Sequence, residues 1–188
     1  MSRDEDRKIK LEIAQQCAPV LAGVKPSNLL ILENTDIGYV VKKLEGTPVS
    51  KKVLWCSNKK SVWLIYREDQ LKDILADWES AAFFKTCGYT RLTEIHAVLG
   101  RLRRRYIAYL ESRRDFPHEM GLLLGYPIAD VVGYIQNKGK NSLLCGYWKV
   151  YDDAEEAKRV FDIYNQVRKF IVEEIMVGKE FCQIVNAC

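Results

Sequence analysis

The stretch that decides the fold class is residues 52–67, which read KVLWCSNKKSVWLIYR. It holds two runs of β-favouring residues, 52–56 and 62–67, on either side of a polar segment of hairpin length. We therefore expect an antiparallel pair of strands here. The short apolar run 28–33 predicts a third strand, and 143–151, which is rich in aromatic and β-branched residues, predicts a fourth.

Amphipathic helices are predicted for most of the remaining chain. The clearest is 91–110, where apolar residues recur every three or four positions and Thr90 is the expected N-cap. The other predicted helices are 7–20, 37–46 with Asp36 as its cap, 70–84, 117–124, 127–135, 152–175 with Asp152 and Glu155 in a capping box, and 181–185. The expected class is α+β, with one small four-stranded, mainly antiparallel sheet covered by six to eight helices.

A chain of 188 residues is long enough for one self-sufficient core, so we expect a single domain over residues 1–188. In this interpretation the strand 143–151 joins the sheet of the first half and ties the two halves together. If it does not join, the chain is expected to divide into two subdomains near residue 90.

Composition limits the classes of protein that need to be considered. The chain is 48% hydrophobic with a net charge of +4, as is typical of soluble globular proteins, and it has no apolar run near the roughly 20 residues of a membrane span. The mixed-charge residues 1–10 do not resemble a secretion signal, so we expect a cytoplasmic protein. The six cysteines are widely spaced, and most are expected to be free, buried thiols.

Two clusters of uncommon residues mark a candidate site. In the first, FPHE at 116–119, Pro117 begins a predicted helix, whose first amides attract anions. His118 and Glu119 are candidates for acid-base catalysis, because the ordinary pKa of histidine is near neutrality and a carboxylate can orient the ring. A zinc site on this helix is not expected, because Leu122 stands where a second histidine would be needed.

The second cluster is CGYWKVY at 145–151, and Cys145 beside Gly146 is its candidate nucleophile. A reactive thiol needs a cationic neighbour or a helix N-terminus beside it, and the sequence shows neither next to Cys145, which favours a packed cysteine instead. Candidate ligand-binding residues, if the two clusters share a wall, are Tyr126, Tyr147, Trp148 and Lys149.

Arginines are concentrated on the helix 91–110 and the segment that follows it. This part of the chain has seven arginines and three acidic residues, so its local net charge of 7 minus 3, or +4, equals the net charge of the whole chain. The residues are Arg91, Arg101, Arg103, Arg104, Arg105, Arg113 and Arg114 against Glu94, Glu111 and Asp115. Arg101, Arg104 and Arg105 are the candidates for a nucleic-acid contact. A solvated helix face is the simpler interpretation, because a pI near 8.7 is only mildly basic.

Three stretches of this sequence resemble a known family. They are CAPVLAGVKP at 17–26, the long motif from Phe116 to Ile135, and CGYWKVY at 145–151. On these motifs the chain resembles an uncharacterised bacterial family, domain of unknown function 3793, known mainly from clostridia-type anaerobes. The resemblance implies no activity. Relatives carry extra cysteines just before the third stretch, where this chain has Ser142 to Leu144, so a metal or redox role is not favoured.

The sequence leaves three functional hypotheses open. The first is a small binding or accessory domain for a small molecule or a protein, with its site where 116–119 meets 145–151. The second is an enzyme that uses His118 and Glu119, with Cys145 as a further participant. The third is a weak nucleic-acid contact through the arginine helix. We favour binding over catalysis, and no cofactor is identified.

Overall fold

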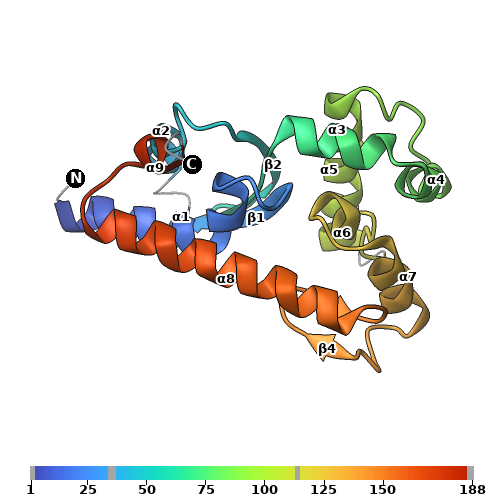
Figure 1. The fold of residues 1–188 in the computed structure, drawn as a ribbon. Coiled ribbons are helices and arrows are strands. Elements are labelled where there is room, and N and C mark those ends of the chain that lie inside the picture. Colours follow the sequence, from blue (N-terminus) through green and yellow to red (C-terminus); the bar gives the residue numbers. More distant parts are fainter. Residues whose placement is uncertain (1–2, 34–36, 113–114, 186–188) are drawn as a thin grey trace. The chain divides into compact units, whose positions relative to one another are not determined.

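The computed structural model describes residues 3–33, 37–112 and 115–185 (Figure 1). Within these ranges the chain forms nine helices, one three-stranded antiparallel sheet and a separate two-stranded hairpin. The mixed helix-and-strand class is confirmed. The prediction of four strands in one sheet is wrong, because the fourth predicted strand does not join the other three.

The contacts divide the chain into two compact units. Unit 1 combines Met1–Arg67 with Tyr164–Cys188, and unit 2 is Glu68–Ile163. The long helix α8 (Ala154–Met176) contributes residues to both. That the whole chain behaves as one domain stays a prediction, which calorimetric unfolding would test.

Unit 1 contains the sheet, and the predicted hairpin is confirmed there. The strands are β1 (Ser27–Glu33), β2 (Ser50–Cys56) and β3 (Lys60–Tyr66), in the order β1-β3-β2 with antiparallel pairing throughout. The central strand β3 is buried at every residue after Lys60. The hydroxyl of Ser57 accepts from the backbone N–H of Lys60 at 3.0 Å, which closes the turn.

Three helices complete unit 1: α1 (Arg3–Leu21), α2 (Ile37–Lys43) and α9 (Phe181–Val185). Together with the end of α8, they bury a shared apolar core against the sheet. The fully buried residues of this core include Ile13, Leu21, Leu30 and Phe181. The predicted helices are confirmed here. The predicted cap Asp36 lies outside the described residues.

Unit 2 is mostly helical. Its helices are α3 (Glu68–Ala76), α4 (Trp78–Thr86), α5 (Ile95–Ser112), α6 (Met120–Leu123), α7 (Ile128–Gln136) and the first part of α8. The single helix predicted over 70–84 is wrong, because Asp77 interrupts it: its carboxylate accepts from the Ser80 N–H at 2.9 Å and caps α4. Thr90 is not a cap, since α5 begins only at Ile95.

The segment predicted as the fourth strand forms a tight hairpin of its own. Its arms are β4 (Leu144–Cys145) and β5 (Lys149–Val150), paired antiparallel. The physical reason is Asp130 on α7, whose carboxylate accepts from the Trp148 indole and from the Tyr151 N–H, both at 2.6 Å. These bonds hold the segment on α7. The cap of α8 is Asp153 and not Asp152, because Asp153 accepts from the first amides of the helix.

None of the described helices combines the length and the apolar character needed to cross a bilayer.

Candidate functional site

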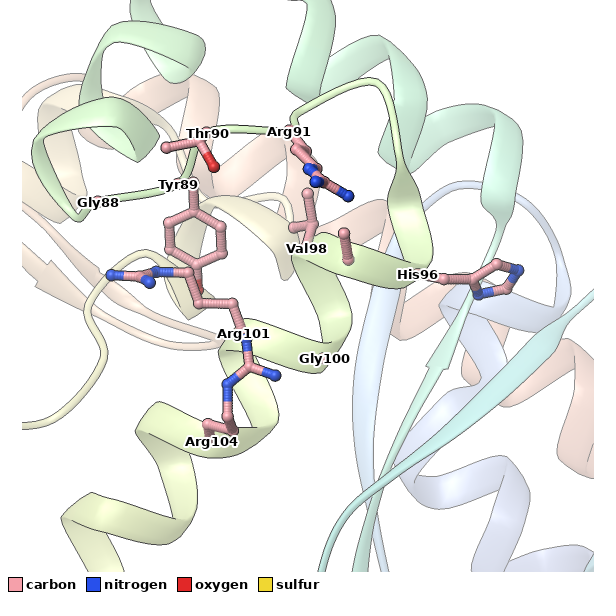
Figure 2. Close-up of a pocket in the computed structure, with 10 residues that line it drawn as sticks. Gly88, Tyr89, Thr90, Arg91, His96, Val98, Gly100, Arg101 and Arg104 are labelled. Carbon is pink, nitrogen blue, oxygen red and sulfur yellow. The ribbon is translucent and has the colours of Figure 1, made fainter.

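A pocket of about 330 Å³ lies between the segment 88–91 and the first turns of α5, within unit 2 (Figure 2). Three arginines line it: Arg91 from the segment, and Arg101 and Arg104 from α5. The lining contains neither an aspartate nor a glutamate. We call it the arginine pocket, and its excess of positive charge makes it the candidate site.

The backbone on one side of the pocket depends on Gly88. This residue ends α4 in the left-handed region, with φ of +79°, and its N–H donates to the carbonyl of Lys85 at 2.9 Å. A Cβ at this position would collide with the guanidinium of Arg101. Only glycine therefore allows the chain to turn here while Arg101 lies against its backbone.

Arg101 is held in place from two sides. Its Nη2 donates to the Cys87 carbonyl at 3.0 Å, and its guanidinium lies over the ring of Tyr89, 5.2 Å from the centroid. Its Nε is buried and has no acceptor among the described residues. The side chain is thus ordered in advance while retaining donor capacity.

Tyr89 is in turn fixed by Glu119. The tyrosine is only 3% exposed, its hydroxyl donates to Glu119 Oε1 at 3.0 Å, and its ring packs edge-to-face on Phe84 at 5.2 Å. Burial, followed by the nearby charge of Glu119, raises the pKa of Tyr89 well above its usual range. Tyr89 therefore stays neutral and rigid beneath Arg101.

Glu119 itself is 1% exposed and accepts from Arg105 as well as from Tyr89. The Arg105 Nε donates to Oε1, and its Nη2 donates to Oε2 at 3.3 Å. This fork pairing neutralises a buried carboxylate, as burial of a charge requires. Arg105 consequently points to Glu119 and does not line the pocket.

The other two arginines of the pocket are exposed. Arg91 Nη1 lies 3.6 Å from Glu94 Oε2, a pair whose side chains are 70% and 55% exposed and which is therefore weak. In Figure 2 the side chain of Arg91 extends from the segment before α5 towards Val98, that of Arg104 extends along the helix, and the ring of His96 points away from both. In the part of the chain that the structure describes, Arg101 and Arg104 form no ion pair.

The residues predicted from the first cluster lie elsewhere in unit 2. His118 packs between Phe116 and Tyr134, with ring centroids 5.7 and 5.6 Å away, and burial lowers its pKa. Cys145 is exposed on β4. Across residues 3–33, 37–112 and 115–185, no hydrogen bond joins His118, Glu119 and Cys145 into one catalytic group.

The two clusters are connected indirectly, through α7. The ring of Tyr134 on this helix contacts His118 and also lies 6.5 Å from the ring of Tyr151, which follows β5. Gly133 makes this packing possible, because a Cβ there would collide with Tyr151. The segments therefore share a neighbour, α7, within the same unit.

The predicted ligand-binding residues make packing contacts around the hairpin. Tyr126 stacks on Trp148 at 5.2 Å, and Tyr147 lies 5.5 Å from the ring of Phe161. Lys149 donates from Nζ to the Gly139 carbonyl at 2.6 Å. None of the four predicted residues belongs to the lining of the arginine pocket.

The cysteines and the metal-ligating side chains show no further site. Of the described cysteines, all free, Cys17 is buried whereas Cys56 and Cys145 are exposed, so the expectation of burial is wrong for these two. They end short strands at the surface, where a thiol has no core to enter. No cluster of three or more histidine, cysteine or acidic side chains able to hold a metal ion occurs among the described residues.

Sequence reasoning placed Arg101 and Arg104 in a candidate surface but missed the pocket. The missing information was the path of residues 88–91, which bring Arg91 and Tyr89 over the helix. A signal for it was present, since Gly88 precedes Tyr89 and the spacing of Arg101 and Arg104 places both on one face of a helix.

The comparisons with known proteins define the family. The family model described as Protein of unknown function (DUF3793) matches residues 13–185, nearly the whole chain. The chain therefore belongs to this family, as its three characteristic stretches predicted. No curated protein and no solved structure matches it.

Proposed function

We propose that this chain is a binding domain that holds a small anionic ligand in the arginine pocket. The observation that carries the proposal is the pocket's charge: three arginines line it, and its lining includes neither an aspartate nor a glutamate. Like charges around one pocket repel one another, so an anion that enters the pocket is stabilised by each of these cations, although Arg91 is partly compensated by Glu94.

The donors are suited to an oxyanion. A guanidinium presents its N–H groups as a planar fork that matches the oxygens of phosphate or carboxylate, and such bonds are stronger than neutral ones. Arg101 is already fixed by Cys87 and Tyr89, so binding orders little that was mobile before. The first turns of α5 also line the pocket, and the positive end of a helix dipole favours an anion.

This proposal keeps the first hypothesis drawn from the sequence, a binding domain, but moves its site. Support for the acid-base alternative is weaker, because both oxygens of Glu119 accept bonds from Tyr89 and Arg105. An aromatic neighbour flanks His118 on each side. A catalytic pair of base and nucleophile needs closer geometry than this.

The nucleic-acid alternative loses one of its three candidate cations. Arg105 is neutralised by Glu119, which leaves Arg101 and Arg104 of the original set. Tight binding to nucleic acid needs several neutralised phosphates. Two arginines that form no ion pair among the described residues, around a pocket of about 330 Å³, fit one small anion better than a polymer.

Thermal unfolding in inorganic phosphate, against sodium chloride of equal ionic strength, tests the proposal. A ligand that binds only the folded state raises Tm, so phosphate should raise Tm of the parent chain. The rise should be lost in Arg101→Gln with Arg104→Gln, and kept in Arg103→Gln, which removes an exposed arginine of α5 that does not line the pocket. An equal rise in all three proteins would overturn the proposal.

A further inference from the structure

We infer that the ligand of the arginine pocket is a small phosphate monoester bound as its dianion, with its organic part against the Ala97–Gly100 side of the pocket. This inference rests on the proposed function, and it specifies the chemical class of the anion.

The charge of the pocket favours a ligand with two negative charges. Arg101 and Arg104 form no ion pair within the described ranges, and Arg91 is only partly compensated by Glu94 at 3.6 Å. A single carboxylate would leave at least one of these cations without a countercharge. A phosphate monoester carries about −1.5 to −2 charges near neutral pH, which matches the two unpaired guanidiniums.

The arrangement of the donors around the pocket favours a phosphate over a carboxylate. Arg91 lies on the segment before α5, Arg101 and Arg104 lie on the helix, and the three side chains point in different directions (Figure 2). Thr90, the neighbour of Arg91 in the segment 88–91, adds a hydroxyl to the lining. A carboxylate accepts hydrogen bonds largely in one plane, whereas the three terminal oxygens of a phosphate ester point in three directions. A tetrahedral anion therefore fits this arrangement better.

The space beside the arginines favours a ligand with an organic part. A volume of about 330 Å³ is at the lower end of what small-molecule sites occupy, and is more than one inorganic anion fills. Ala97, Val98 and Gly100 contribute little or no polar side chain to this part of the lining. A Cβ added at Gly100 would meet no atom closer than Arg104 Nη1 at 4.0 Å, so the helix surface is open there. The ester group belongs on this surface.

Calorimetric titration of the intact chain at two pH values tests the charge state. The probes are glycerol 3-phosphate, dimethyl phosphate and sulfate, each at constant ionic strength. The monoester changes from monoanion to dianion with a pKa near 6, so its affinity should rise by about fourfold from pH 5.5 to pH 7.5 relative to sulfate. Dimethyl phosphate, a monoanion throughout, should bind at least tenfold more weakly than the monoester at the higher pH.

Sulfate is the control for the protein's own titration, since it stays a dianion across the interval. The titratable groups around the pocket are the three arginines, Tyr89, His96 and Glu94, and any change in their charge alters sulfate binding too. Sulfate binding combined with equal affinity for the monoester and for dimethyl phosphate would overturn the monoester and leave the anion pocket standing. Absence of binding by all three probes would overturn both.

A substitution at Gly100 tests the position of the ester group. In Gly100→Leu the new side chain occupies the open helix surface, so glycerol 3-phosphate should bind at least tenfold more weakly while sulfate is affected much less. Retained sulfate binding shows that the variant is folded and that its arginines are in place. Unchanged binding of the monoester would contradict the placement. Because a Cβ at Gly100 lies 4.0 Å from Arg104 Nη1, Gly100→Ala is the control for displacement of that arginine, and equal weakening of both probes in Gly100→Ala would overturn the placement too.

Discussion

The hydroxyl of Tyr89 donates to Oε1 of Glu119 at 3.0 Å, and the same tyrosine ring lies beneath the Arg101 guanidinium. Glu119, which the sequence marks as a catalytic candidate, is thereby connected to the arginine pocket through the side chain of Tyr89. Its effect on the pocket is mechanical, because it holds the ring on which Arg101 rests. Variants of these two residues should therefore separate stability from binding.

Tyr89→Phe is expected to lower the free energy of unfolding by about 1 kcal/mol, because it removes one hydrogen bond to the buried carboxylate of Glu119. The ion pair of Glu119 with Arg105 remains in this variant. Phosphate affinity should fall less than threefold, since the ring under Arg101 remains. Tyr89→Leu removes that ring and should weaken binding more than Tyr89→Phe does. Urea unfolding and calorimetric titration measure the two quantities, and equal affinity in both variants would show that the ring does not position Arg101.

Glu119→Gln should destabilise the fold more than Tyr89→Phe. The neutral amide leaves Arg105 without its countercharge, and we expect a loss of about 2 kcal/mol, below the figure for fully buried pairs because the Arg105 side chain is 37% exposed. Urea unfolding of both variants checks the order. A smaller loss in Glu119→Gln would mean that the ion pair contributes little.

His118 predicts a dependence of stability on acid. Burial lowers its pKa from the ordinary value of 6.5, so below that value the unfolded chain binds a proton that the folded chain does not. This part of the stability is present above about pH 6.5 and is lost as the pH falls towards the folded pKa. The free energy of unfolding, measured for the parent chain and for His118→Gln as the pH falls from 6.5, should decrease less steeply in the variant. Parallel plots of this free energy against pH would rule out the effect.

Lys25 in unit 1 predicts a dependence on base. Its side chain is 2% exposed, and burial lowers its pKa from 10.5 to about 8, with the charge of Arg168 adding to the shift. Between these two values the unfolded chain binds the extra proton, so stability rises with pH. At about 1.4 kcal/mol per pKa unit, the parent should gain about 1 kcal/mol relative to Lys25→Met from pH 7 to pH 9. A constant difference between the two proteins would contradict the shifted pKa.

Replacement of Gly146 in the hairpin is expected to lower the stability of the fold. A Cβ there would collide with the ring of Phe161, and relieving such a clash costs about 1–3 kcal/mol. Gly38 in α2 is the matched control, because a Cβ there meets no atom of the described residues within 4 Å and alanine favours a helix. Thermal unfolding should show a lower Tm for Gly146→Ala and an unchanged or higher Tm for Gly38→Ala. The reverse order would contradict the packing.

Local patterns in the sequence predicted most elements of the fold but not how they pair. The hairpin at 52–67 was predictable because its turn and its β-favouring runs are contiguous. The destination of 143–151 was not, because it depends on Asp130, whose bonds to Trp148 and Tyr151 cross about twenty positions of sequence. A buried aspartate in a helix leaves no periodic signal that names its partners.

The candidate site was predictable to a similar degree. The excess of arginine on 91–110 marked the helix that lines the arginine pocket, but the sequence could not tell that Glu119 pairs with Arg105, whereas Arg101 and Arg104 form no ion pair among the described residues. That division depends on a contact between α5 and the turn before α6. The pocket also depends on Gly88, whose positive φ and whose contact with the Arg101 guanidinium both require a residue without a side chain.

The most direct test of the anion pocket is nuclear magnetic resonance of the chain labelled with ¹⁵N-arginine, which follows the Nε–H signals during titration with glycerol 3-phosphate. The account predicts that the signals of Arg101 and Arg104 shift and saturate together, while that of Arg103, on the same helix but outside the pocket, stays unchanged. Equal small shifts of all three arginines, or none at all, would contradict it.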